Sequence, residues 1–212
     1  MLTFTNTYSE LQRAVSYHQL GQLDQAENIY RKILEDDPQH VDALHLLGLV
    51  TYQSGRVEIA INLMKEAISL SPESSNLLCD LGDIFRALGR FEESIQVYQR
   101  AMVVGSKSAE IYNVIGLTFK DSGKTEEAIQ AYQKAIQIDP DYVEAYNNLG
   151  NSFKADRRFE EALQAFQQAL KLNPNIAEIH NSYGNILYGL NKLEEAIQAY
   201  QHAIRINPKH SQ

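Results

Sequence analysis

Apolar residues recur along this chain at the spacing of amphipathic helices, and the pattern restarts at a fixed interval. In one interval, Tyr146, Leu149 and Phe153 form a first apolar stripe, and Leu163 and Phe166 belong to a second. Each stripe follows the spacing that places side chains on one face of an α-helix. The pattern therefore predicts two amphipathic helices in each interval, packed against each other as a hairpin.

The interval is 34 residues long, and prolines mark it. All five prolines are spaced by 34 residues or a multiple of it, and Ser106 is the position in this series, which we call the proline lattice, that lacks a proline. The prolines are Pro38, Pro72, Pro140, Pro174 and Pro208. Because a repeat of this length cannot bury its own apolar face, successive repeats must stack. The sequence thus predicts an all-α solenoid of six helix-turn-helix repeats after a leader at 1–6. Repeats 1 to 6 span 7–40, 41–74, 75–108, 109–142, 143–176 and 177–210.

Small and large residues recur in register within these repeats. The eighth position of repeats 2 to 6 is always glycine, at Gly48, Gly82, Gly116, Gly150 and Gly184. The twenty-fourth position is large, at Tyr30, Met64, Tyr98, Tyr132, Phe166 and Tyr200. The twentieth position is small as well, at Ala26, Ala60, Ser94, Ala128, Ala162 and Ala196, and the two small columns predict that the two helices of each repeat cross closely. The twenty-seventh position is alanine in repeats 2 to 6, so large residues meet small ones as a close-packed interior requires.

The turn between the two helices also has a recurring composition. Four repeats carry a glycine there, at Gly21, Gly55, Gly89 and Gly123, which suits a left-handed conformation at a helix end. Acidic pairs follow in four repeats, at Glu92-Glu93, Glu126-Glu127, Glu160-Glu161 and Glu194-Glu195. We assign these carboxylates to the positive end of the second helix rather than to catalysis, because the same pair recurs in four repeats.

The recurring residues resemble the tetratricopeptide repeat. Repeat 5 carries its signature columns at Tyr146, Leu149, Gly150, Phe153, Ala162, Phe166, Ala169 and Pro174, with tyrosine in the place of tryptophan. The resemblance covers residues 7–210. It implies a right-handed superhelix of helix pairs, in which the first helices line a concave groove.

Composition narrows the classes of partner. Lys and Arg total 19 against 27 Asp and Glu, and the net charge of −8 argues against nucleic acid or anionic membranes. A single cysteine, Cys79, cannot form an internal disulfide and favours a reducing compartment. The opening residues lack the basic start and the apolar run of a signal peptide or membrane span. We therefore expect a cytoplasmic protein without membrane insertion.

Two irregularities interrupt the repetition. In repeat 1, the first helix has Arg13, flanked by Ser9 and Ser16, at the position where repeats 2 to 6 have Leu47, Leu81, Ile115, Leu149 and Tyr183. Repeat 1 is therefore expected to be the N-terminal cap. The vacant lattice position lies within 104–108 and lacks the usual proline. A looser joint is expected there, which is either a hinge between repeats 3 and 4 or sequence drift without consequence.

The last repeat keeps an apolar face. Ile197, Tyr200 and Ile204 have no polar replacement, and no polar capping helix follows them. A large exposed apolar patch is unusual on a monomer. We expect this end face to be covered by a further domain, by a partner, or by a second copy of the chain.

The sequence shows no constellation for catalysis or metal binding. The histidines occupy scattered columns without i, i+4 pairing, at His18, His40, His45, His180, His202 and His210. Phosphate loops, dinucleotide fingerprints and nucleophile elbows are also missing. Asp80 and Asp83 disfavour a thiolate at Cys79, which we interpret as inert. We expect no catalytic residue, metal or cofactor.

Polar residues recur on the predicted groove side of the first helices. Amides stand at Asn113, Asn147, Asn148, Asn151, Asn181 and Asn185, and cations stand at Arg86, Lys120 and Lys154. Amides spaced along a superhelix can bond the backbone of an extended peptide, and the cations would favour acidic stretches. The alternative is that these asparagines serve contacts between neighbouring helices.

Two functions remain. The first is a noncatalytic protein interaction scaffold that holds an extended peptide or partner protein in its groove and can self-associate through its C-terminal end. The second is the substrate-recruiting arm of a larger enzyme. Segments 18–21, 26–34 and 42–48 look like the opening repeats of bacterial proteins with glycosyltransferase, sulfotransferase or methyltransferase domains, and segment 146–151 is similar to repeats of O-linked N-acetylglucosamine transferases.

Overall fold

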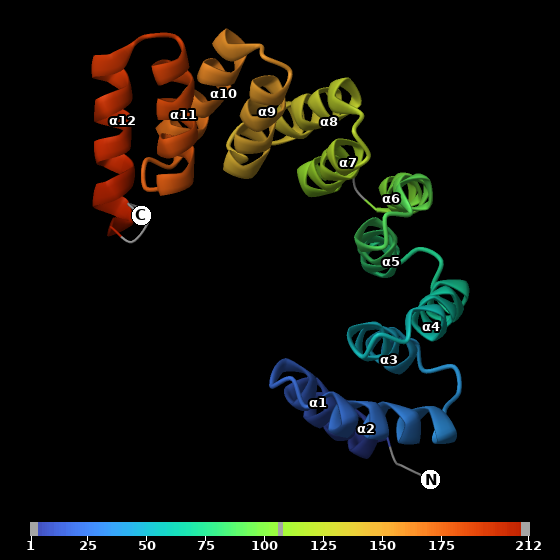
Figure 1. Cartoon of the computed structure of the whole chain (residues 1–212). Coiled ribbons are helices and arrows are strands. Elements are labelled where there is room, and N and C mark those ends of the chain that lie inside the picture. Colours follow the sequence, from blue (N-terminus) through green and yellow to red (C-terminus); the bar gives the residue numbers. More distant parts are fainter. Residues whose placement is uncertain (1–3, 106–107, 209–212) are drawn as a thin grey trace. The chain divides into compact units, whose positions relative to one another are not determined.

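A computed structural model of the chain describes residues 4–105 and 108–208. Within these ranges the regular structure is entirely α-helical, in agreement with the predicted all-α repeat. The helices are α1 (Phe4–Gln19), α2 (Leu23–Asp36), α3 (Val41–Gln53), α4 (Val57–Leu70), α5 (Ser75–Ala87), α6 (Phe91–Val104), α7 (Ala109–Asp121), α8 (Thr125–Ile138), α9 (Val143–Ala155), α10 (Phe159–Leu172), α11 (Ala177–Gly189) and α12 (Leu193–Ile206). Figure 1 shows them following one another as helical hairpins.

The chain divides into two compact units, Met1–Ser106 and Lys107–Gln212. Within each unit, the two helices of a hairpin pack together, and each second helix also packs against the first helix of the next hairpin. The division falls at Ser106, where the regular spacing of prolines lacks a proline. Ser106 and Lys107 themselves lie outside the described residues, so the hinge stays a prediction.

The second helix of repeat 3 does not need a proline to end. α6 ends at Val104, the same position in the repeat at which α8 ends at Ile138. Gly105 follows, and a Cβ atom added there would lie 3.0 Å from the Cβ of Ser75. This close approach to the start of α5 shows that the end of α6 is packed against its own unit.

The two helices of a hairpin cross where glycine faces an aromatic ring. A Cβ atom on Gly150 would lie 2.7 Å from Cε1 of Phe166, and one on Gly116 would lie 2.5 Å from Cε1 of Tyr132. Both rings are fully buried. The predicted close crossing of the two helices is therefore confirmed, and the structure shows that the glycine column meets the aromatic column there, where no residue larger than glycine fits.

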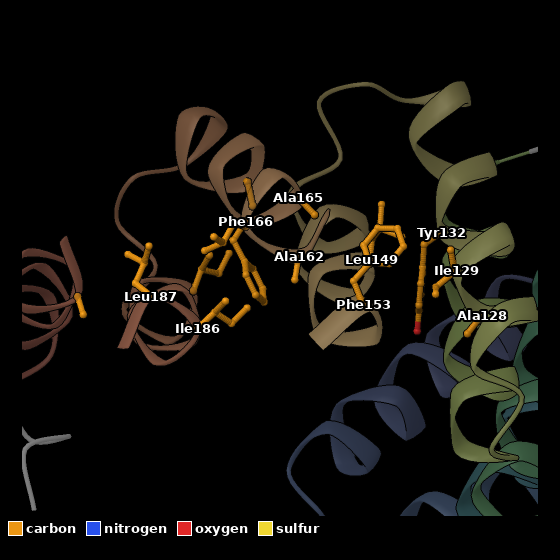
Figure 2. Close-up of a cluster of buried hydrophobic side chains, with 14 residues drawn as sticks. Ala128, Ile129, Tyr132, Leu149, Phe153, Ala162, Ala165, Phe166, Ile186 and Leu187 are labelled. Atoms are coloured by element: carbon orange, nitrogen blue, oxygen red, sulfur yellow. The ribbon is translucent and has the colours of Figure 1, made fainter. Parts of the chain in front are cut away.

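The core of the C-terminal unit continues from one hairpin to the next. Tyr132 of α8 and Leu149 of α9 belong to the same buried cluster as Phe166 of α10 and Leu187 of α11. Figure 2 shows these side chains as a row between the successive helices. Each repeat thus completes the core of its neighbour, as expected for units that cannot fold alone.

The left-handed turn occurs in every hairpin, although only four carry glycine there. Gly21, Gly55, Gly89 and Gly123 have φ angles of 73, 80, 71 and 79°, which confirms the predicted conformation. Arg157 and Asn191 occupy the same turn in repeats 5 and 6, with φ angles of 58 and 61°. The backbone therefore keeps one turn geometry even where the side chain opposes it.

The acidic pairs lie in the first turns of α6, α8, α10 and α12, as predicted. The second carboxylate of a pair also binds the preceding arginine in two hairpins. Arg90 Nε donates to Glu93 over 2.6 Å, and Arg158 Nε donates to Glu161 over 3.0 Å. Hydrogen bonds from these arginines lower the pKa of both carboxyl groups. The carboxylates are therefore held by helix ends and ion pairs, which is a structural role.

Candidate functional site

A small pocket in the C-terminal unit brings together two of the predicted groove residues. Its volume is about 310 Å³, and its lining residues are Lys154, Phe159, Asn185, Ile186 and Gly189. Lys154 is in the last turn of α9, Phe159 begins α10, and the other residues belong to α11. The helical repeat therefore places a cation and an amide from successive first helices beside apolar side chains.

The polar groups of this pocket can bind an acceptor. Asn185 Oδ1 already accepts a hydrogen bond of 2.8 Å from the Tyr200 hydroxyl, so its Nδ2 group is the part left to donate. Lys154 is half-buried and has no ion-pair partner among the residues that the structure describes. An ammonium group and an amide donor beside Ile186 suit a carboxylate or a peptide carbonyl next to an apolar group.

The pocket also has unfilled space. A Cβ atom added to Gly189 would meet nothing within 4 Å outside its own helix. Gly189 ends α11 with no left-handed φ angle, so a larger residue is compatible with the backbone there. The position therefore allows the pocket to be blocked without disturbing the core.

Some of the asparagines that were predicted to line the groove form hydrogen bonds with one another instead. Asn113 is only 6% exposed, and its Oδ1 accepts a hydrogen bond of 2.9 Å from Asn148 Nδ2. Asn147 Oδ1 accepts one of 3.3 Å from Asn151 Nδ2 within α9. The first pair joins α7 to α9, which is the alternative role that we considered from the sequence. We leave Asn113 and Asn148 out of the candidate site.

The remaining predicted groove residues are less closely assembled. Lys120 on α7 and Asn181 on α11 are exposed in the C-terminal unit. Arg86 lies on α5 in the N-terminal unit, half-buried, with Nη2 3.9 Å from Asp83 Oδ1. The candidate site is therefore built from α9 and α11, with Lys154 and Asn185 at its centre.

Sequence reasoning missed a second recurring cluster. The Arg90 guanidinium lies 4.6 Å from the ring centre of Phe85, and that of Arg158 lies 4.4 Å from the ring centre of Phe153. Phe85 and Glu93 line a hollow of about 660 Å³. Phe153, Arg158 and Glu161 line another of about 470 Å³. The signal was present as the same Phe-x4-Arg spacing in repeats 3 and 5. Because each arginine is already paired with glutamate and stacked on phenylalanine, we assign the clusters to stability.

Other chemistry is not indicated by the described residues. Among them, no three His, Cys, Asp or Glu side chains gather where they could hold a metal ion. Cys79 is half-buried, and burial followed by the nearby Asp83 and Asp80 raises the pKa of its thiol. A raised pKa disfavours the nucleophilic thiolate. Within the described ranges, no helix combines the length and apolar character needed to cross a membrane.

Comparison with protein families decides what kind of repeat this is. A family model described as TPR repeat matches residues 82–123 and 116–156, and one described as tetratricopeptide repeat matches 147–211. The chain contains tetratricopeptide repeats. A model of the anaphase-promoting complex, cyclosome, subunit 3, matches residues 19–101. Comparison with curated protein sequences gives no match.

Solved structures share the tetratricopeptide-repeat fold at low identity. Pseudomonas aeruginosa pilF is 18% identical with a TM-score of 0.76, over 95% of this chain and 92% of pilF. A MamA fragment from Desulfovibrio magneticus RS-1, which runs from residue 41 to the end, is 16% identical with a TM-score of 0.69, over 81% of this chain and 97% of the fragment. YrrB, described as a TPR protein with an unusual peptide-binding site, is 17% identical with a TM-score of 0.64, over 85% and 93% of the two chains. The likeness establishes the fold.

Proposed function

We propose that this chain is a noncatalytic interaction scaffold that binds an extended peptide along the first helices of its C-terminal unit. The observation that carries the proposal is the pocket in which Lys154 and Asn185 lie beside Phe159 and Ile186. This combination of a cation, an amide donor and apolar side chains suits one residue of a bound peptide. The polar groups would bind its backbone carbonyl or carboxylate, and the apolar side chains would contact its apolar side chain.

The bound peptide is acidic in this proposal. Lys154 would pair with a carboxylate of the peptide, since no anion of the described part of the chain neutralises it. The Nδ2 group of Asn185 would donate to a backbone carbonyl, and Ile186 and Phe159 would contact an apolar side chain. Exposed Asn181 and Lys120 lie on neighbouring first helices and would extend contact along the peptide.

The fold supports a scaffold more than an enzyme arm. YrrB has the same fold and is described as having a peptide-binding site, although identity of 17% carries no residue-level assignment. None of the three solved structures described above is a glycosyltransferase, so the similarity to O-linked N-acetylglucosamine transferase repeats finds no support there. The single cysteine still favours a reducing compartment, and we place the scaffold in the cytoplasm.

The test uses fluorescent nonapeptide mixtures and measures binding by fluorescence anisotropy. Each of three mixtures has leucine at the central position. The other positions contain alanine together with glutamate in the first mixture, glutamine in the second and lysine in the third. We expect the glutamate mixture to bind best, because Lys154 provides a positive charge at the pocket. Equal binding of the glutamate and lysine mixtures, or no binding of any mixture, would overturn the proposal.

Two variants locate the binding site. Gly189→Leu fills the pocket from a position with open space and should abolish binding of the glutamate mixture. Lys154→Ala should weaken it about fivefold or more, as expected for loss of one charged contact. Lys171→Ala removes an exposed lysine of α10 outside the pocket and should leave binding unchanged. Wild-type affinity in Gly189→Leu would place the peptide elsewhere.

A further inference from the structure

An apolar stripe on α12 is exposed although the same stripe is covered in earlier repeats. Leu193, Ile197 and Ile204 are 43, 55 and 47% exposed. The residues that occupy the position of Ile197 in repeats 2 to 5 are buried, namely Ile61 (2%), Ile95 (9%), Ile129 (1%) and Leu163 (8%). We call Leu193, Ile197, Tyr200 and Ile204 the end face. Its chemistry is that of a surface that packs against another helix.

The N-terminal repeat does not offer a matching surface. Arg13 lies on the first helix where repeats 2 to 6 have an apolar or aromatic residue, and Arg13 is exposed together with Ser9 and Ser16 on either side of it. Stacking α1 of one copy on the end face of another would bury the Arg13 guanidinium against Ile197. Arg13 is paired with Glu10 over 2.6 Å at the surface, and burial of this pair would cost the desolvation of both charges, so head-to-tail stacking of copies is disfavoured.

Pairing of two end faces by a two-fold axis avoids that cost. A two-fold contact uses the same surface on both copies, so apolar residues of one α12 meet apolar residues of the other. In an antiparallel arrangement centred near Tyr200, Ile197 of each copy lies at the level of Ile204 of the second copy. The helix dipoles of the two α12 helices then also oppose each other.

Charges beside the end face fit this arrangement. Glu194 and Arg205 are both exposed, and neither has an ion-pair partner among the described residues. They stand eleven residues apart, which is about three helical turns, so both lie on the same flank of the stripe. An antiparallel pair centred near Tyr200 brings Glu194 of each copy opposite Arg205 of the second copy. The symmetry produces this contact twice.

We propose that the chain forms a two-fold dimer through α12, with the end faces packed antiparallel and Glu194 paired with Arg205 of the second copy. The dimer covers the exposed isoleucines and stops at two copies, because a two-fold contact is closed. This inference rests on the end face alone and does not depend on peptide binding at Lys154.

The test is sedimentation velocity of the 212-residue chain over a concentration series. We expect a monomer and a dimer, with the dimer fraction rising with concentration and no larger species. Ile197→Glu should give a monomer at every concentration, and it should melt at the same temperature as the wild type at concentrations too low for the dimer to form, because the side chain is 55% exposed in the monomer. Ile59→Glu is the matched control, since Ile59 on α4 is 48% exposed, and it should leave the dimer intact.

Charge reversal tests the orientation of the helices. Glu194→Arg and Arg205→Glu should each weaken the dimer about tenfold or more, because each places like charges opposite one another. The double variant restores opposite charges and should recover most of the affinity. A strictly monomeric chain would overturn the proposal, as would a dimer that survives Ile197→Glu. Failure of the double variant to recover affinity would refute the antiparallel pairing, and a ladder of larger species would favour head-to-tail stacking.

Discussion

Asn148 of α9 donates a hydrogen bond of 2.9 Å from Nδ2 to Oδ1 of Asn113 on α7. The equivalent positions in the N-terminal unit hold a different pair, in which His45 Nε2 lies 2.6 Å from Asp80 Oδ2. The fifth position of one repeat therefore meets the sixth position of the next in both units. Polar residues at these positions connect successive first helices, and their identity varies while their geometry is kept.

The first prediction concerns the Asn113–Asn148 pair. Asn148→Ala should lower the free energy of unfolding by about 1–3 kcal/mol, because it leaves the amide of buried Asn113 without its partner. Asn181→Ala removes an exposed amide and should stay within about 0.5 kcal/mol of the wild type. Urea unfolding followed by circular dichroism measures both. Equal stability of the two variants would show that the hydrogen bond contributes little.

The sequence predicted contacts within a hairpin better than contacts between hairpins. The close crossing of the two helices was predictable, because small residues recur on both of them, as at Gly150 and Ala162 in repeat 5. The bond between Asn113 and Asn148 was not, since it depends on how neighbouring first helices are rotated relative to each other. Periodicity fixes which face of a helix is buried, but it does not fix this rotation.

The same limit applies to the candidate site. Lys154 and Asn185 could be assigned to one side of the repeats from their positions alone. The pocket between them depends on Phe159 and on the space left at Gly189. Gly189 lies outside the repeating glycine columns, so its role could not be inferred from the repeat.

The second prediction compares two glycines that are both helical. Gly150→Ala should destabilise the chain by about 1–3 kcal/mol, because the new Cβ atom would lie 2.7 Å from the ring of buried Phe166. Gly189→Ala meets nothing and should be neutral or stabilise by up to about 1 kcal/mol through helix propensity. Thermal and urea unfolding should therefore give changes of opposite direction. Similar destabilisation by both variants would contradict the assigned crossing.

The third prediction concerns the left-handed turn residue of repeat 5. Arg157 has a φ angle of 58°, a conformation that costs a non-glycine residue about 1–2 kcal/mol. Arg157→Gly should stabilise the chain by about 0.5–1 kcal/mol, because relief of this strain exceeds the entropic cost of glycine. Arg157→Ala keeps the strain and should leave stability unchanged. Equal gains from both variants would instead point to the exposed arginine side chain as the cause.

The fourth prediction separates two buried tyrosines at the same position of different repeats. The Tyr30 hydroxyl has no hydrogen-bond partner among the described residues, and burial raises the pKa of Tyr30 to about 12. The Tyr98 hydroxyl donates to Asp83 Oδ1 over 2.7 Å. Tyr30→Phe should keep or raise stability by up to about 1 kcal/mol, whereas Tyr98→Phe should lower it by about 1–3 kcal/mol. Urea unfolding measures both changes, and a reversed order would refute the assigned bonding.

The last prediction concerns acid unfolding. Hydrogen bonds from Arg56, opposed by burial and assisted by Arg31, lower the pKa of Glu27 from 4.5 to about 2. Arg56 Nη1 and Arg31 Nε each donate to Glu27 Oε1 over 2.9 Å, and Arg56 Nη2 donates to Oε2. Because the folded state holds the proton less tightly than the unfolded state, the ionised carboxylate stabilises the fold above pH 4.5. This contribution should be lost as the pH falls from 4.5 to 2.

Glu27→Gln tests that assignment, because glutamine keeps the shape of the side chain without its charge. We expect the variant to be less stable than the wild type by a constant amount above about pH 5, with the difference shrinking as the pH falls below 4.5. Glu66→Gln is the control, because it changes an exposed carboxylate of α4 outside the first and last turns of that helix, and it should stay within about 0.5 kcal/mol of the wild type at each pH. Urea unfolding at intervals between pH 2 and 7 measures the difference. A stability gap that does not depend on pH would mean that Glu27 acts through packing rather than through its charge.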